Sequence, residues 1–175
     1  MARQAIRHEG DNAERIFRRL VKDSRLSPDP RRGDAQVLVD GEWHFVEIKE
    51  CHSNTINQVR AIKFIPLIIY SPENNRPWAV IPPHEVVNLV SAKSRGQHTE
   101  IPFESANLSL SQLPDNFRCD DEDLEQKVLQ AIRSGNDFAE VKETMMNPYS
   151  ELVALNKRTK SRVAEIFRRK RYQAG

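Results

Sequence analysis

Asp34, Glu47 and Lys49 are charged residues that lie within or beside two stretches of otherwise apolar, β-branched sequence. The Asp40-Gly41 turn signal between the two stretches predicts a β-hairpin. Because side chains alternate along a strand, Glu47 and Lys49 share one face of the second strand. We expect the hairpin to bring Asp34 back beside Glu47, so that the three charges converge at one end of a sheet.

Such a group suits metal-assisted hydrolysis of phosphodiester bonds. The carboxylates of Asp34 and Glu47 are the hard oxygen ligands that Mg²⁺ prefers, and the backbone carbonyl of Ile48 is a further candidate ligand. The metal polarises a phosphate and lowers the pKa of a bound water. Lys49 is suited to position that water and to neutralise developing charge. We therefore expect Mg²⁺ as the cofactor, with Mn²⁺ able to substitute.

The same residues also have simpler interpretations. Glu47 and Lys49 can form an ion pair on an exposed strand, and Asp34 can cap a turn after Gly33.

The surrounding pattern predicts an α/β fold with a mixed sheet. Helical spacing of apolar residues, short apolar runs and turn signals give the order helix, strand, strand, helix, strand, strand, helix. The corresponding segments are residues 11–22, the hairpin of residues 35–49, and residues 54–65, 66–72, 78–83 and 84–96. From residue 121 onward the pattern is helical. We expect a core of residues 1–114 and a helical appendage of residues 115–175.

Asp34 and the triplet Glu47-Ile48-Lys49 resemble the motif of the PD-(D/E)xK nuclease superfamily, the fold of many restriction endonucleases and of archaeal Holliday-junction resolvases. The resemblance covers residues 9–90 and implies a restriction-endonuclease-like αβββαβ core. It also implies catalytic roles for Glu14 on the first helix and for Gln58 on the helix after the triplet. The sequence departs from the motif at Gly33, where the superfamily name has Pro. Glu14 has an alternative role as a surface ion pair with its Arg neighbours.

Basic residues near these motifs and in the last helix favour double-stranded DNA as the partner. The whole chain has a formal net charge of only +2, but residues 156–175 hold eight Lys or Arg and one Glu. The alternative is a solvated charged surface. The candidate DNA contacts are Arg31, Arg32, Arg60, Lys63, Lys93, Arg95, Gln97, Lys157, Arg158 and Lys160.

The resemblance and the charges together imply a DNA endonuclease. We favour a restriction-type enzyme that cuts a defined sequence as a homodimer. A structure-specific nuclease like the Holliday-junction resolvases, a mobile-element nuclease and a non-catalytic DNA-binding protein stay open, and RNA ranks last as a substrate. The C-terminal helices are interpreted as a helix-turn-helix-like DNA-binding element or as a dimerisation element.

The remaining features indicate a cytoplasmic protein with no membrane association. Cys51 and Cys119 have no metal-binding or disulfide-framework spacing. The sequence has neither an apolar run of membrane-spanning length nor the pattern of a secretory signal at its start.

Overall fold

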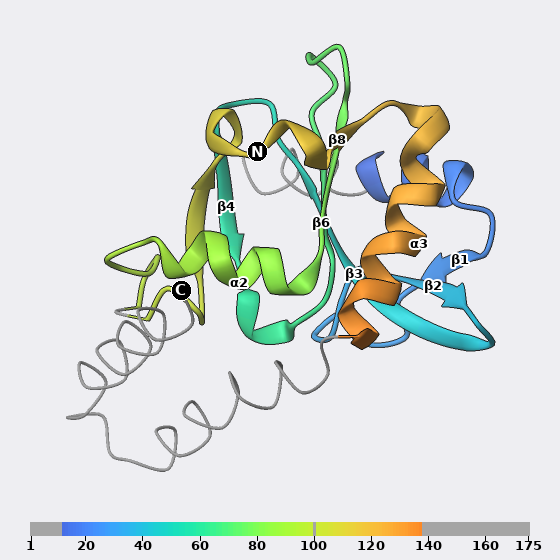
Figure 1. Ribbon diagram of the computed structural model, residues 1–175, viewed down its shortest axis with the longest axis horizontal. Helices are drawn as coiled ribbons and strands as arrows, with labels where there is room; N and C mark the ends of the chain where they lie inside the picture. The colour runs from blue at the N-terminus through green and yellow to red at the C-terminus, as the bar shows by residue number, and fades with distance from the viewer. Residues whose placement is uncertain (1–11, 100, 138–175) are drawn as a thin grey trace, which may run out of the picture.

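The computed structural model describes residues 12–99 and 101–137, which form an α/β fold around a mixed six-stranded sheet (Figure 1). The predicted α/β class with a mixed sheet is confirmed. The sheet has the strand order β1 (Ser24–Leu26), β2 (Ala35–Val39), β3 (Glu42–Glu50), β5 (Leu67–Tyr70), β6 (Trp78–Ile81) and β8 (Arg118–Cys119). A second sheet pairs β4 (Thr55–Val59) with β7 (Ala106–Ser109). The helices are residues 12–20, α2 (Pro83–Ser91) and α3 (Asp121–Asp137), and the 3₁₀ helices are η1 (Ala61–Lys63), η2 (Leu110–Gln112) and η3 (Asp115–Phe117).

The predicted hairpin is present as β2 and β3. The two strands pair antiparallel, with Ala35 opposite Val46. Asp40 and Gly41 have φ values of 52° and 83°, and positive φ at both central residues is what a two-residue type I′ turn requires. The Asp-Gly signal therefore fixes both the turn and the register of the strands that carry Asp34 and Glu47.

The segment after β3 differs from the sequence prediction, which placed a helix over residues 54–65. β3 and β5 are parallel, so the chain must cross over between them. The crossover contains β4 and η1 instead of the predicted helix. Gln58 has a φ of 53°, which interrupts an α-helix, and β4 finds a strand partner in β7. That pairing with a distant segment overrides the local helical pattern.

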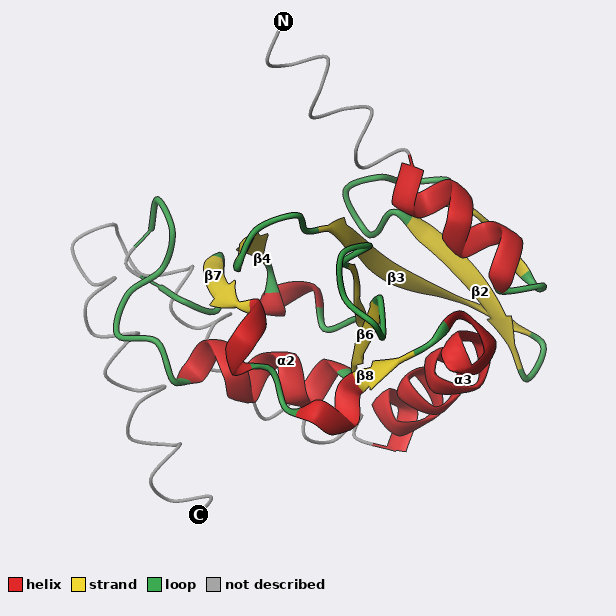
Figure 2. Cartoon of the chain, turned by 90° about the horizontal axis from the view of Figure 1, so that it is seen from above, coloured by secondary structure: helices red, strands yellow, loops and turns green. Residues whose placement is uncertain are grey.

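Two hydrophobic cores cover the two faces of the main sheet. On one face, residues 12–20 and α3 pack against β2, β3, β5 and β6. On the other face, α2, β4, β7 and the loops around them pack against β5 and β6. Figures 1 and 2 show these two groups of elements on opposite sides of the sheet. Among the elements of residues 12–99 and 101–137, neither helical layer covers the half of the second face formed by β1, β2 and the start of β3.

Residues 118–137, which were predicted to be part of the appendage, belong to the sheet and its core. β8 pairs with β6, with Cys119 opposite Trp78. The indole Nε1 of Trp78 donates to Asp121 at the first turn of α3 at 2.7 Å, and Leu124 and Val128 of α3 are fully buried. The rest of the appendage, with Lys157, Arg158, Lys160 and the helices interpreted as DNA-binding or dimerising, lies outside the described residues.

Both cysteines of the chain are buried and neither forms a disulfide. Burial raises the pKa of the Cys119 thiol to about 11. No helix within residues 12–99 and 101–137 has the length and apolar character needed to cross a membrane.

Candidate active site

Asp34 lies beside Glu47 at the end of the hairpin, as the sequence predicts. The Asp34 backbone N–H donates to the carbonyl of Val46 at 2.9 Å. The Ile48 N–H donates to the Asp34 carboxylate at Oδ2, at 2.8 Å. These two bonds tie Asp34 to β3 on both sides of Glu47, so its carboxylate is held by the neighbouring strand.

Glu47 and Lys49 form the predicted neighbours on one face of β3. Lys49 Nζ lies 3.9 Å from Glu47 Oε1, and the two side chains are 21% and 13% exposed. Val46 and Ile48, which alternate with them, are buried in the core on the opposite face. The pair is therefore largely withdrawn from solvent, unlike the ion pair of an exposed strand.

Lys63 is a fourth member of the group, although it was predicted to be a DNA contact on a helix. Its Nζ donates to Glu47 Oε2 at 2.7 Å, and its side chain is 13% exposed. The contact depends on the path of the crossover, where η1 ends at Phe64 in a left-handed conformation. Residue spacing carries no information about that path, although a lone Lys in the apolar stretch from Ala61 to Tyr70 is a signal of a buried charge.

Opposing electrostatic effects act on Asp34 and Lys49. Burial and the nearby charge of Glu47 raise the pKa of Asp34, although the Ile48 N–H and the charges of Lys63 and Lys49 oppose this. Burial lowers the pKa of Lys49, opposed by Glu47 and Asp34. Two carboxylates that are close together and partly dehydrated are stabilised by positive charge between them.

The donor atoms fit Mg²⁺ better than a softer metal. The N–H and C=O of one residue in a strand point to the same side, so the Ile48 carbonyl lies on the side of Asp34. Within the described ranges, no cluster of three or more His, Cys, Asp or Glu side chains is arranged to hold a metal. The oxygen atoms that could hold a metal here are those of two carboxylates and a carbonyl, and Mg²⁺ commonly completes such a set with waters and substrate phosphate.

Gly33 allows the chain to approach β3 closely enough to place Asp34. A Cβ atom at this position would lie 2.9 Å from the Val46 carbonyl oxygen and 3.1 Å from Phe45 Cβ. Proline also carries a Cβ, so the residue that the superfamily motif has here does not fit this backbone. The departure from the motif therefore has a steric cause.

Gln58 does not occupy the helical position that the resemblance implies. It lies on β4 at a register shift between Ile56 and Val59. Its backbone N–H donates to Gln97 Oε1 at 2.8 Å and to Asn107 Oδ1 at 3.2 Å. The Gln97 amide oxygen, which was expected to contact DNA, thus holds the bulge of β4. A catalytic role for the Gln58 side chain stays a prediction.

The loop that carries Lys93, Arg95 and Gln97 is more compact than its sequence suggests. A Cβ at Gly96 would lie 2.7 Å from each of three carbonyl oxygens, those of Thr99, Ile101 and Ser105. α2 ends at Ser91 rather than at Gly96. Gly96 is required by close packing, and a DNA role for Lys93 and Arg95 stays a prediction.

Glu14 lies on the helix of residues 12–20 and is half-buried. Asn12 on the same helix donates to Glu50 Oε1 at 3.4 Å, so this helix begins near the end of β3. Ala13 and Phe17 pack in the core on the face opposite to Glu47. The catalytic role that the resemblance implies for Glu14 stays a prediction.

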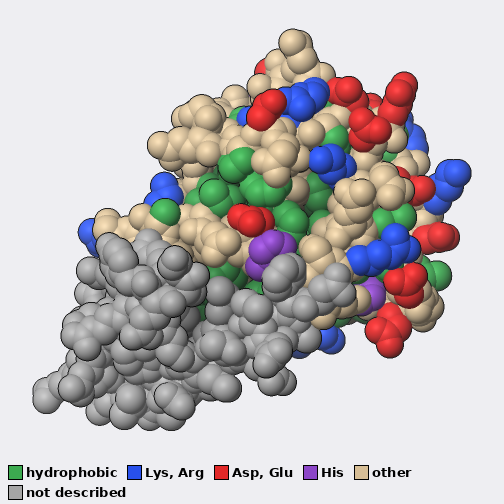
Figure 3. Space-filling model, in the orientation of Figure 1, with side chains coloured by type: hydrophobic (Ala, Val, Ile, Leu, Met, Phe, Trp, Pro, Cys, Tyr) green, Lys and Arg blue, Asp and Glu red, His purple; other side chains and the backbone are tan. Residues whose placement is uncertain are grey.

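The other basic candidates differ in their surroundings. Arg31 is 90% exposed and pairs with Asp29 at 3.1 Å, whereas the Arg32 guanidinium lies 4.3 Å from the centre of the Phe45 ring. The charge of Arg60 contributes to lowering the pKa of Lys49, so Arg60 belongs to the surroundings of the site. Figure 3 shows Lys and Arg side chains interspersed with Asp and Glu on the described part of the face that it presents. In its described part, this face therefore has no large area of positive charge alone.

No family model matches this chain, and no match was found among curated proteins or solved structures. The resemblance to the nuclease superfamily therefore rests on the motif residues and on their geometry.

Proposed function

We propose that this protein is a Mg²⁺-dependent nuclease that hydrolyses phosphodiester bonds in DNA, built on a restriction-endonuclease-like core. The observation that carries the proposal is the placement of Asp34 beside Glu47 by the 2.8 Å bond from the Ile48 N–H. Lys49 on the same face completes the residue set of the motif. Partial burial of three charged side chains costs free energy. A hairpin with a purely structural role would avoid this cost with uncharged residues.

Each residue has a distinct role in the proposal. Asp34, Glu47 and the Ile48 carbonyl hold the metal, which when bound polarises the phosphate and lowers the pKa of a coordinated water. Lys49 orients the water and donates to the phosphate oxygens. In the metal-free protein Lys63 balances the charge of Glu47 through the 2.7 Å bond, a position that the metal would take over when it binds.

The order of elements supports the core assignment in part. A helix precedes an antiparallel group of three strands, and the third strand pairs parallel with the next strand of the sheet. This agrees with an αβββ-crossover-β order. The crossover through β4 and η1 departs from the αβββαβ order, which is why the assignment is a proposal.

Within this function, the sequence favours a homodimeric restriction-type enzyme that acts on double-stranded DNA in the cytoplasm. The second candidate is a nuclease that selects DNA by its structure. The observation that favours the second candidate is a surface on the same sheet face, where Arg25 and Arg32 stack on Trp43 and Phe45.

The test is digestion of a large DNA of known sequence, with Mg²⁺, with Mn²⁺ and with EDTA. Wild-type protein is compared with Glu47→Gln and with the control Glu42→Gln, which changes an exposed acid on the same strand. We expect metal-dependent cleavage by the wild type and the control and loss of at least about 100-fold in Glu47→Gln, the size typical of removing one group that stabilises the transition state. Equal cleavage by Glu47→Gln would overturn the site assignment.

A negative result with linear duplex is followed by the same comparison on forked and branched DNA. No metal-dependent cleavage of any of these substrates would overturn the nuclease proposal and leave a DNA-binding protein as the alternative.

A further inference from the structure

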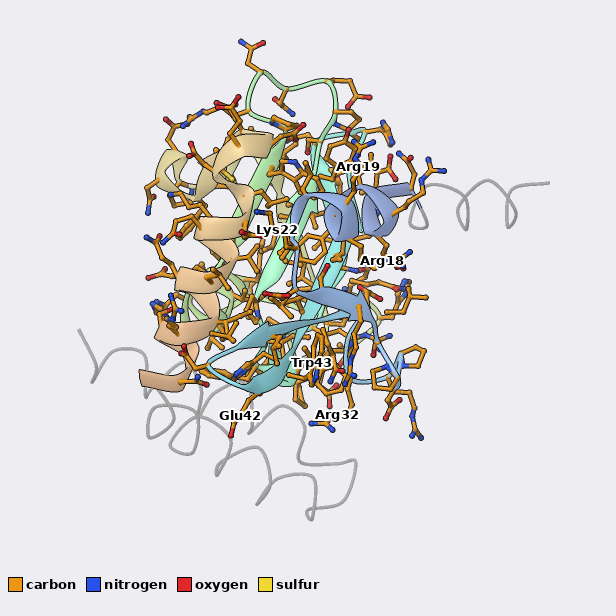
Figure 4. The ribbon with its side chains drawn as sticks, turned by 90° about the vertical axis from the view of Figure 1, so that its right-hand side faces the viewer. Arg18, Arg19, Lys22, Arg32, Glu42 and Trp43 are labelled. Atoms are coloured by element: carbon orange, nitrogen blue, oxygen red, sulfur yellow. The ribbon has the colours of Figure 1, made fainter. Side chains whose placement is uncertain are left out.

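Two arginines stack on two aromatic rings near the hairpin. The Arg25 guanidinium lies 3.9 Å from the centre of the Trp43 ring, and the Arg32 guanidinium lies 4.3 Å from the centre of the Phe45 ring. We call these four residues the aromatic–arginine strip. Figure 4 labels Trp43 and Arg32 at the same end of the molecule, away from Arg18 and Arg19 on the first helix.

The strip continues directly into the candidate active site. Trp43 and Phe45 occupy alternate positions of β3, as do Glu47 and Lys49, so all four side chains belong to one face. Trp43 is four residues from Glu47, which corresponds to about 13 Å along a strand. A polymer lying along this face would contact the strip and the carboxylates at the same time.

This part of the sheet face is partly open to solvent. Trp43 is 37% exposed, and it and Leu26 are the exposed large hydrophobic residues of the described part of the chain. The first helix and α3 cover the opposite face. Trp43 and the stacked arginines together form a surface with aromatic and cationic groups side by side.

The strip is also positively charged. Arg25 Nε donates to the amide oxygen of Gln36 at 2.9 Å, and Arg32 rests on the Phe45 ring. The groups that directly contact these two arginines are uncharged, although the charge of Arg32 also interacts with Asp29. By contrast, the neighbouring Arg31 is paired with Asp29.

We propose that the aromatic–arginine strip binds unpaired nucleotides of a DNA strand whose adjoining phosphate enters the site of Asp34 and Glu47. The direction of the strand toward that site rests on the proposed nuclease function. Bases in a duplex stack on one another, whereas unpaired bases stack on aromatic rings and on guanidinium planes. The arginines can also bind the phosphates that link those bases. The substrate class is therefore DNA with a single-stranded segment next to the cleaved bond.

The first test measures binding in EDTA, where cleavage does not interfere. The probes are an oligothymidylate of about 12 nucleotides, within the range that single-strand sites cover, and a blunt duplex of the same length. The variants are Trp43→Leu and Arg25→Gln, and the control is Leu26→Ala, which removes the other exposed apolar side chain. Thermal unfolding of each variant confirms that it is folded.

Loss of stacking on one base is worth about 1–3 kcal/mol, so we expect Trp43→Leu to weaken binding of the single strand by about 5- to 150-fold. Leu26→Ala should bind as the wild type does, and the wild type should prefer the single strand to the duplex. Trp43→Phe keeps a ring and should retain most of the affinity. Unchanged single-strand affinity in Trp43→Leu and Arg25→Gln would overturn the proposal.

A second readout uses intrinsic fluorescence. The chain has two tryptophans, and Trp78 is fully buried. Quenching by the oligonucleotide should therefore come from Trp43 and disappear in Trp43→Phe. A wild-type dimer that dissociates in Trp43→Leu, without a change in oligonucleotide affinity, would assign the strip to self-association and contradict the proposal.

These outcomes separate this proposal from the proposed function. If cleavage depends on Glu47 but the strip variants bind single strands normally, only the proposal about the aromatic–arginine strip is overturned. Binding of single strands through Trp43 without metal-dependent cleavage would overturn only the nuclease activity.

Discussion

Lys63 lies on the crossover that joins the parallel strands β3 and β5, and its Nζ donates to Glu47 Oε2 on β3 at 2.7 Å. The bond brings a second lysine to a carboxylate that Lys49 approaches from its own strand at 3.9 Å. In the protein without metal, these two ammonium groups supply the positive charge that the carboxylates require. A divalent cation bound by Glu47 would therefore compete with Lys63 for Oε2, which makes Lys63 a sensitive probe of the site.

Lys63→Met should destabilise the metal-free protein and increase its response to Mg²⁺. Removal of one partner from a largely buried ion pair costs on the order of 3 kcal/mol, whereas loss of a competing positive charge strengthens cation binding. Thermal unfolding with and without Mg²⁺ measures both effects, with Lys93→Met as the control. An increase in melting temperature with Mg²⁺ no larger than that of the wild type would contradict this role.

Asp34→Asn should make the protein more stable in EDTA than the wild type. Burial and the charge of Glu47 raise the pKa of Asp34, which means that its ionised form is disfavoured in the folded protein. An amide oxygen can still accept the Ile48 N–H. The variant should gain melting temperature in EDTA and lose most of the stabilisation by Mg²⁺; a lower melting temperature in EDTA would show that the carboxylate stabilises the fold.

Gly33→Ala should disturb the site through the backbone. Its Cβ would lie 2.9 Å from the Val46 carbonyl oxygen, which is the atom that accepts the Asp34 N–H. Overpacking of this kind costs about 1–3 kcal/mol, and the shift should weaken metal binding. Gln130→Ala is the control, because Gln130 is an exposed residue of α3 away from this contact. Wild-type stability and metal affinity in Gly33→Ala would refute the packing argument.

Stability should fall as the pH rises past the pKa of His52. Hydrogen bonding to Glu73 raises this pKa, burial opposes the rise, and hydrogen bonding to Glu50 adds to it. A pKa that is higher in the folded state gives stabilisation that is complete below the unfolded value of about 6.5 and is lost as pH rises through the folded value. The side chain is 41% exposed, so the effect is small. Melting temperatures from pH 5 to 9 should fall less steeply in His52→Gln than in the wild type. Parallel curves would show that His52 does not contribute to the pH dependence of stability.

The sequence predicts those parts of the fold that local signals determine. The Asp40-Gly41 turn and the alternation along β3 place Asp34, Glu47 and Lys49 together, because a hairpin register follows from its turn. The crossover could not be predicted in this way. β4 is a strand because β7 pairs with it, and β7 is distant in the chain.

α3 shows a signal that was present but given too little weight. The change from strand patterns to helical patterns near its start suggested a boundary between the core and an appendage. The apolar residues Leu124, Val128, Ala131 and Ile132 nevertheless follow helical spacing, and all four are buried against the sheet. A helix with such a stripe needs a surface to cover it, and β8 directly before it joins the sheet.

The most direct test of the central claim is Mn²⁺ binding followed by electron paramagnetic resonance, in which bound Mn²⁺ loses the signal of the free ion. The comparison is between the wild type, Asp34→Asn, Glu47→Gln and the control Glu42→Gln. We predict that the wild type and the control bind Mn²⁺, that Mg²⁺ displaces it, and that each site variant loses most of the binding. Equal Mn²⁺ binding by all four proteins would contradict the assignment of Asp34 and Glu47 as metal ligands.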